Sequence, residues 1–194
     1  MFALVLGSLL LPAYLIIQKK TQKLSHQLAF LWFLASGSIH FFFEGYFTVF
    51  HKTLAGHSTL FGELWKEYAL SDSRYLSSDP FVLFMEAITA FAWGPICYLI
   101  AYMVYHQDSR RHLFIVVVSV GQIYGDVLYY MTTLFEGAPH TRPEPFYFWA
   151  YFVFMNAIWL VIPTCFIIQS GTIALDILDK VKEVDGGSKK TKKQ

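Results

Sequence analysis

Asp79-Pro-Phe-Val-Leu-Phe-Met-Glu86-Ala-Ile-Thr-Ala-Phe-Ala-Trp-Gly-Pro95 is an apolar run that contains one carboxylate, Glu86. We expect a helix from Pro80 to Tyr105, because Asp79 suits the N-cap and Pro80 the first helical position, where a missing N–H costs nothing. About 26 residues at ~1.5 Å each exceed a hydrocarbon core of ~30 Å. A carboxylate at the depth of Glu86 is rare unless it faces the interior of a helix bundle.

The composition is that of an integral membrane protein. Of 194 residues, 55% are hydrophobic and 15% charged, and the mean hydropathy is +0.43, which is too apolar for a soluble domain of this size. Cys97 and Cys165 both fall in apolar segments, where we expect packing and neither a disulfide nor a metal site. No nucleotide-binding or hydrolase motif is present, and the net charge of +1 gives no reason to expect a nucleic-acid partner.

Five apolar segments indicate an all-α bundle of five transmembrane helices in a single domain, residues 1–194. The segments are residues 2–17, 27–50, 80–105, 112–135 and 146–170. The first is short for a span, but a signal peptide is disfavoured because Lys19, Lys20 and Lys23 follow the apolar run instead of preceding it. Residues 171–194 are expected to form a basic tail with a flexible polar end from Gly186.

The longest connection, residues 51–79, carries apolar side chains at helical spacing from Leu60 to Tyr68, with charged residues on the other face. This pattern predicts an amphipathic helix at the membrane interface on the luminal side. Such a helix would roof a cavity; a loop that only rests on the headgroups is the equally weighted alternative.

The distribution of basic residues predicts the orientation. Eleven of the 15 Lys and Arg residues lie in the connection after the first span, in the connection after the third span, or after the fifth span. By the positive-inside rule the C-terminus is then cytosolic and the N-terminus luminal. The final Lys190-Thr-Lys-Lys-Gln194 resembles the dibasic signals that return membrane proteins to the endoplasmic reticulum. A solvated or lipid-touching basic tail is the alternative.

The four later segments contain few ionisable residues, and these fall at one depth. Within the cores of these segments they are His40, Glu44, Glu86 and Asp126, with no Lys or Arg among them. Polar or aromatic side chains that could contact a ligand at this level are Thr89, Trp93, Gln122, Tyr124, Asn156 and Trp159. The pairs His40/Glu44, Glu86/Thr89 and Asn156/Trp159 have i,i+4 or i,i+3 spacing, so each pair shares a helix face. We expect the three pairs to converge beside kinks at Pro95 and Pro163.

Several of these residues also have a plain structural interpretation. Asn156 alone is more often interhelical glue than a site, and Trp93 and Trp159 are by default packing or belt residues. Asp126 follows two glycines, so a structural hydrogen bond to a neighbouring helix is favoured for it. Glu44 and Glu86 differ, because burying two carboxyl groups without a basic partner requires that they be protonated.

Such a pocket suits a cation that arrives bound or forms in place. Carboxyl groups and aromatic faces shielded from water stabilise positive charge. An apolar substrate that becomes cationic when an acid protonates its carbon–carbon double bond fits this description. An acid and a base in one cavity would then move the double bond, and we expect no metal or organic cofactor.

Four blocks of sequence resemble the emopamil-binding protein family of sterol Δ8–Δ7 isomerases, in the EXPERA superfamily. They are Leu64–Tyr75, Met85–Ala90 with Trp93-Gly-Pro95, Val118–Tyr129 and Phe148–Leu160. The resemblance implies a cofactor-independent enzyme of the endoplasmic reticulum membrane that shifts the ring-B double bond in cholesterol- or ergosterol-type biosynthesis. It also implies a homodimer that binds cationic amphiphilic amine drugs.

The resemblance also implies site residues. The functional residues of the family fall on His40, Glu44, Glu86, Thr89, Asn156 and Trp159. We take His40, Glu44 and Glu86 as catalytic, and Thr89, Asn156, Trp159, Trp93, Tyr124 and Asp126 as substrate-binding. The acid is assigned to Glu44 supported by His40, with Glu86 facing the cation, and the reverse assignment stays open. A non-enzymatic receptor for sterols or amines is the main alternative function, and a proton-coupled carrier is the third.

Overall fold

The computed structural model describes residues 2–191, with side chains for residues 6–182. This part of the chain is helical or connecting. Its α-helices are α1 (Phe2–Lys20), α2 (Leu24–Ser38), α3 (Gly45–Phe50), α4 (Leu60–Tyr68), α5 (Arg74–Ser77), α6 (Pro80–Ile88), α7 (Gly94–Tyr105), α8 (Arg111–Phe135) and α9 (Asn156–Thr191). The π-helical segments are η1 (Ile39–Glu44), η3 (Thr89–Trp93) and η4 (Tyr147–Met155), and η2 (Leu54–Gly56) is a 3₁₀ turn.

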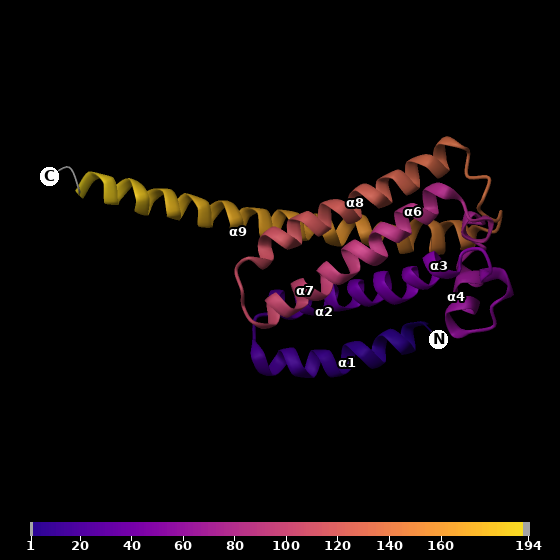
Figure 1. Ribbon diagram of the computed structural model, residues 1–194, viewed down its shortest axis with the longest axis horizontal. Coiled ribbons are helices and arrows are strands. Elements are labelled where there is room, and N and C mark those ends of the chain that lie inside the picture. Colours follow the sequence, from indigo (N-terminus) through magenta and orange to yellow (C-terminus); the bar gives the residue numbers. More distant parts are fainter. Residues whose placement is uncertain (1, 192–194) are drawn as a thin grey trace.

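The helices join end to end into long rods, and rods that follow each other in the sequence are antiparallel (Figure 1). Four rods are long and apolar enough to cross a membrane: Leu24–Phe50, Pro80–Tyr105, Arg111–Phe135 and Tyr147–Lys182. They coincide with the last four predicted apolar segments to within three residues at each end, except that the last rod continues twelve residues beyond residue 170. Helix α1 packs along α2 at the edge of the bundle. We count α1 as the first rod, so the four rods above are the second to the fifth. We call the end with residues 51–79 and 136–146 the loop end, and the end with residues 21–23 and 106–110 the turn end.

The predicted tail differs from the structure. Helix α9 continues without a break through Thr191, so residues 171–191 extend the last rod beyond the turn end. The boundary after residue 170 was predicted from the loss of apolar residues. An existing helix, however, propagates at little cost through polar residues. The ion pair between Lys182 and Asp179, at 3.2 Å, adds a small stabilisation. The last residues of the basic tail, 192–194, lie outside the described residues.

The start of the third rod follows the sequence prediction. The side chain of Asp79 accepts a hydrogen bond of 3.0 Å from the backbone N–H of Val82, and Pro80 occupies the first turn. The capped helix therefore enters the bundle at a defined residue, which fixes the register of Glu86 one turn and a half further on.

Three rods contain π-helical segments near the loop end. In η3 the N–H of Gly94 reaches the carbonyl of Thr89, five residues back. Pro95 lacks an N–H, so the helix around Phe91 is free to widen there. The kink predicted at Pro95 thus takes the form of a π segment, whereas Pro163 lies inside continuous α9. Segments η1 and η4 contain no proline.

Two glycines bring the second and third rods into close contact. A Cβ atom on Gly94 would lie 3.1 Å from the backbone nitrogen of Phe41, and one on Gly37 would lie 3.2 Å from the carbonyl oxygen of Gly94. Phe41 belongs to η1, which also packs against η3. The approach therefore sets the distance between the helix that carries His40 and the helix that carries Glu86.

We expect Gly94→Ala to destabilise the protein by about 1–3 kcal/mol, because the new methyl group must push backbone apart. Thermal unfolding in detergent measures this change. Gly171→Ala is the matched control, since a Cβ there meets nothing within 4 Å and alanine is the better helix former. Equal effects of the two substitutions would contradict the packing described.

The connection at the loop end folds over the bundle. The stretch from Leu60 to Tyr68 forms helix α4, and Thr59 accepts a hydrogen bond of 3.2 Å from the N–H of Gly62 at its start. Trp65 on α4 stacks on Phe43 with ring centroids 4.3 Å apart and donates to the Phe43 carbonyl at 2.8 Å. We call α4 and α5 together the roof.

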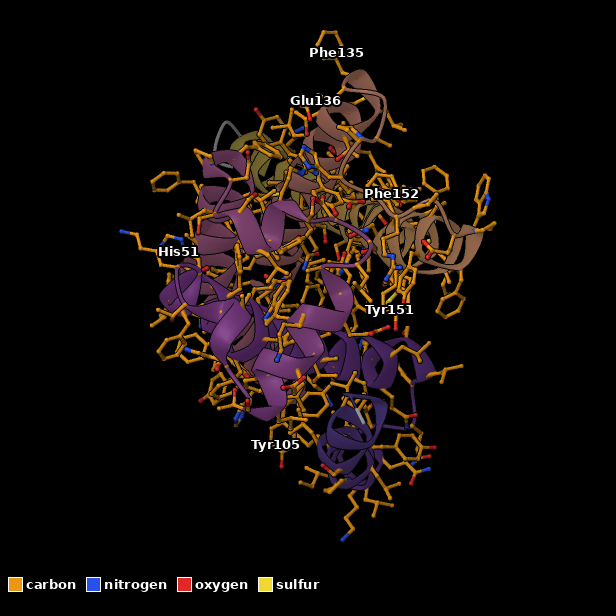
Figure 2. The ribbon with its side chains drawn as sticks, turned by 90° about the vertical axis from the view of Figure 1, so that its right-hand side faces the viewer. His51, Tyr105, Phe135, Glu136, Tyr151 and Phe152 are labelled. Carbon is orange, nitrogen blue, oxygen red and sulfur yellow. The ribbon has the colours of Figure 1, made fainter. Side chains whose placement is uncertain are left out.

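The outer faces of the rods are apolar, as expected for lipid contact. Figure 2 looks onto the loop end and shows the ring of Phe135 pointing away from the molecule, where it is 93% exposed. Trp149 and Phe146 in and before η4 are also largely exposed. Aromatic side chains at this level of a membrane protein are typical of the interface belt.

Candidate functional site

A cavity of about 990 Å³ lies among the rods beneath the roof. This volume is at the upper end of the roughly 300–1,000 Å³ of small-molecule sites. Its lining comes from α1, the second and third rods, the roof, α8, η4 and α9, and most of that lining is apolar. Among the described residues, no Lys or Arg lines it.

The structure brings seven of the nine predicted site residues to this cavity. They are His40, Glu44, Glu86, Thr89, Asp126, Asn156 and Trp159. Trp93 and Tyr124 do not line it. The Trp93 ring lies on Gly121, where a Cβ would come within 2.6 Å of it. Tyr124 is 66% exposed on the outside of α8, because the cavity face of this helix is set by Gln122 and Asp126, four residues apart.

His40 and Glu44 form a buried pair inside η1. The Nδ1 atom of His40 lies 2.7 Å from Oε2 of Glu44, and Nε2 of His40 lies 3.1 Å from the amide nitrogen of Gln122. In this arrangement Gln122 donates to Nε2, so the ring proton is on Nδ1 and is donated to Glu44. The Gln122 carbonyl oxygen is buried without a partner among the described residues. Turning the amide over would let Gln122 accept from a protonated His40, so the site accommodates both charge states of the imidazole.

Glu86 faces this pair from the third rod. Its Oε1 accepts a hydrogen bond of 2.6 Å from the hydroxyl of Tyr75, and the hydroxyl of Thr89 lies 3.4 Å from its Oε2. The carboxyl groups of Glu86 and Glu44 lie within interaction range of each other. Two acids from different helices therefore share one apolar chamber, where a proton or a cation between them lowers their repulsion.

The indole of Trp159 lies against the imidazole of His40. The two ring centroids are 4.8 Å apart, and the ring of Trp32 lies 5.2 Å from Trp159 on α9. All three rings line the cavity. A positive charge on His40, or on a ligand beside it, would therefore meet an aromatic face.

Asn156 links the last rod to the roof. Its Nδ2 donates to the carbonyl of Phe152 at 2.7 Å, and its Oδ1 accepts from the hydroxyl of Tyr68 at 3.2 Å. Asn156 thus hydrogen-bonds to α4 and to a carbonyl of η4, at the residue where η4 ends and α9 begins.

Asp126 differs from the structural role favoured for it above. Its Oδ2 is buried and has no hydrogen-bond partner among the described residues, although the residue lines the cavity. A hydrogen bond to a neighbouring helix is therefore not what holds this side chain. An unpartnered carboxyl oxygen facing a cavity is free to accept a hydrogen bond from a ligand.

Two tyrosines of the site, Tyr68 and Tyr75, were not among the predicted site residues, because that prediction was limited to side chains within the spans. Both come from the roof, and burial raises the pKa of each well above its usual value, so both remain hydrogen-bond donors. The Asp72-Ser-Arg74 sequence directly before Tyr75 could have indicated a site residue there, because its buried ion pair holds the roof in place. Arg74 is buried, forms an ion pair of 2.6 Å with Asp72, and lies 5.0 Å from the Tyr129 ring centroid.

The amino-acid sequence matches a known protein family. The family described as EXPERA (EXPanded EBP superfamily) matches residues 60–170. The 3-beta-hydroxysteroid-Delta(8),Delta(7)-isomerase of Mus musculus is 44% identical over 157 residues, 79% of this chain and 68% of the mouse chain. The Rattus norvegicus protein of the same name is 46% identical over 138 residues, 71% of this chain and 60% of the rat chain.

A more distant relative carries the same enzyme name. The probable 3-beta-hydroxysteroid-Delta(8),Delta(7)-isomerase of Oryza sativa is 36% identical over 165 residues, which cover 84% of this chain and 75% of the rice chain. The alignments with the rodent proteins cover less of the relatives, down to 60% for rat. The family match spans more than half of the described chain and includes the rods that carry Glu86, Asp126 and Asn156. This multi-pass membrane protein belongs to the EXPERA family.

Proposed function

We propose that this protein is an isomerase that moves the ring-B double bond of a sterol from Δ8 to Δ7. The observation that carries the proposal is the pairing of two carboxyl groups, Glu44 and Glu86, across one apolar cavity with His40 bonded to the first. The names of the mouse, rat and rice relatives support the same reaction. The reaction needs only an acid and a base, so no cofactor is part of the proposal.

The chemical steps balance within the substrate. The acid gives a proton to carbon 9 of the C8=C9 double bond, which leaves the positive charge on carbon 8. The base then removes a proton from carbon 7, and the electron pair of that C–H bond forms the C7=C8 double bond. One proton enters and one leaves, so the enzyme ends in the same total protonation state.

We assign the acid to Glu44 with His40 and the base to Glu86. Glu86 accepts from Tyr75 and lies beside the Thr89 hydroxyl, and these two contacts hold its carboxyl group in position opposite Glu44. His40 can resupply Glu44 with a proton because Nδ1 lies 2.7 Å from its carboxyl oxygen. The aromatic faces of Trp159 and Trp32 contribute about 2 kcal/mol to a nearby cation, so the carboxyl groups carry most of the stabilisation.

The substrate contacts of the proposal follow from the cavity. Asn156 and Thr89 hold the polar layer in place, and Asp126 accepts a hydrogen bond from the sterol through its unpartnered oxygen. The apolar remainder of the lining, which extends to Leu6 and Leu10 of α1, takes the hydrocarbon portion of the molecule.

The proposed setting is the endoplasmic reticulum membrane. In this proposal α1 is a fifth span of the single domain, the N-terminus and the roof are luminal, and the C-terminus is cytosolic. The basic residues around the turn end support that orientation. We further propose a homodimer in contact with membrane lipid that also binds cationic amphiphilic amines.

A second function, an amine or sterol receptor without turnover, rests on the same carboxyl pair. Carboxylates without a lining Lys or Arg would hold an ammonium ion whether or not they transfer protons. Incubation of the purified chain with a Δ8 sterol in detergent, without added cofactor, distinguishes the two. We expect a Δ7 product by chromatography; binding of the sterol without product would support the receptor and contradict the isomerase.

Tyr75→Phe tests the contact between the roof and the carboxyl layer. The substitution removes the 2.6 Å hydrogen bond to Glu86, and we expect kcat to fall about tenfold, as for the loss of one hydrogen bond to a charged group. Tyr98→Phe is the control, because Tyr98 bonds to Ser38 away from the cavity. An unchanged kcat for Tyr75→Phe would remove Tyr75 from the proposed mechanism.

A further inference from the structure

A second cavity, of about 50 Å³, lies near the turn end, where α2 and α8 begin beside the middle of α9. Its polar lining consists of Ser25, His26, Arg111, His112, Gln169 and Ser170. Only Ser25 and Gln169 also border the large cavity. The small cavity is therefore a separate site at the opposite end from the roof. It has room for about four water-sized atoms, given about 10–15 Å³ for each on this measure.

Arg111 is the main charge in this cavity, and its guanidinium group is not hydrogen-bonded to any carboxylate within residues 6–182. The residue is 9% exposed. Its Nη1 donates to the backbone carbonyl of Asp108 at 2.9 Å, and its Nη2 lies 3.4 Å from Nε2 of His26. Among residues 6–182, no carboxylate forms an ion pair with Arg111. A buried guanidinium without an anion is costly, so a counter-ion from outside the chain is favoured.

The nearest carboxylate is already occupied by another arginine. Asp108 receives hydrogen bonds from Nε and Nη2 of Arg110, at 3.0 and 2.6 Å. The side-chain hydrogen bonds from Arg110 lower the pKa of Asp108 to about 2, so this carboxylate is ionised and committed to Arg110. Arg110 is thereby neutralised, while the next residue, Arg111, hydrogen-bonds only to neutral groups and interacts with the Asp108 charge without forming an ion pair.

The other side chains of the cavity add donors and no negative charge. Nδ1 of His112 lies 3.0 Å from the hydroxyl of Ser170 on α9, and both residues are buried. His26 approaches from α2. Nitrogen and hydroxyl groups from three helices thus converge with a net positive charge, which is the arrangement that binds an oxyanion.

We propose that this cavity binds a phosphate group, through Arg111, His112 and Ser170. A guanidinium matches two phosphate oxygens at once, and a volume of about four water-sized atoms suits one tetrahedral head. The site lies where apolar rods begin, so the phosphate can belong to the headgroup of an anionic lipid or to free phosphate. The proposal does not depend on the isomerase activity.

Native mass spectrometry of the purified full chain in detergent tests the proposal. The probes are phosphatidate, phosphatidylcholine and inorganic phosphate. We expect phosphatidate to remain bound about tenfold more strongly than phosphatidylcholine, and Arg111→Gln to lose this preference. Arg110→Gln is the matched control, because it removes the same charge one residue away but outside the cavity; it should keep the preference.

The remaining outcomes also decide the question. Ser170→Val removes the proposed hydroxyl ligand and adds one methyl group to the cavity without changing charge. It should likewise abolish the preference, which covers the case that Arg111→Gln fails to fold. Displacement of phosphatidate by inorganic phosphate supports a free-anion site, and failure to displace it supports a headgroup site. Equal loss in Arg110→Gln and Arg111→Gln, or retained preference in both Arg111→Gln and Ser170→Val, would overturn the proposal.

Discussion

Glu86→Gln is expected to reduce kcat for Δ8-sterol isomerisation by about a thousandfold. A positioned proton-transfer group contributes roughly 10²–10⁴-fold to rate, and the amide can neither take the proton from carbon 7 nor offset the charge on carbon 8. The fold should survive, because the amide oxygen can still accept the hydrogen bond from Tyr75 that Oε1 accepts in the native protein. Steady-state turnover by the purified variant measures the effect.

The control for Glu86→Gln is Glu63→Gln. Glu63 lies on the exposed face of α4, bonded to Lys66, and does not line the cavity. It should therefore keep normal turnover. Binding of the Δ8 sterol to Glu86→Gln, measured separately, shows that the pocket is intact. A Glu86→Gln protein that binds sterol and turns over within about threefold of normal would contradict the assignment of Glu86 as base.

Asp72→Ala is expected to destabilise the protein by about 3–5 kcal/mol, because it leaves Arg74 buried without its counter-charge. Asp72 receives Nε and Nη2 of Arg74 at 3.0 and 2.6 Å, and Arg74 also donates to Thr133 on α8. The pair thereby ties the roof to α8 next to Tyr75. The measurement is thermal unfolding in detergent, where this loss corresponds to a midpoint lower by roughly 10 °C.

The chain contains its own control for this prediction. Asp108-Ser-Arg110 repeats Asp72-Ser-Arg74, with the matching contacts at 3.0 and 2.6 Å, but its arginine side chain is 77% exposed. Asp108→Ala should change the midpoint little, because exposed ion pairs contribute little. Replacing both Asp72 and Arg74 by apolar residues should recover most of the loss. Equal effects of Asp72→Ala and Asp108→Ala would contradict burial as the cause.

The cavity layer was predictable because helical spacing alone determines which side chains share a face. The i,i+4 spacing of His40 and Glu44 and the capped start at Asp79 fixed two faces, and both line the cavity as expected. The same rule explains why Tyr124 lies outside, since two residues beyond Gln122 is nearly the opposite side of a helix. Trp93 required knowledge of the neighbouring helix, because Gly121 opposite it is what receives the ring.

The roof contacts could not be obtained from spacing. Tyr75 reaches Glu86 from a short helix whose position depends on the tertiary packing of Trp65 and on the buried Asp72–Arg74 pair. Segment η1 likewise has no proline to mark it, so the local sequence contains no signal for its wider turn, which packs against η3. The end of α9 was predicted too early, at residue 170, because the apolar residues end there. Polar residues do not stop a helix, and α9 continues to Thr191.

In the proposed mechanism, a proton from the protein enters carbon 9 while another leaves carbon 7 of the same sterol. Incubating the purified chain with a Δ8 sterol in deuterated water, followed by mass spectrometry and NMR of the product, tests it directly. The mechanism predicts a Δ7 sterol that carries one deuterium at carbon 9. A Δ7 product without deuterium at that carbon, or unchanged Δ8 sterol bound to folded protein, would contradict it.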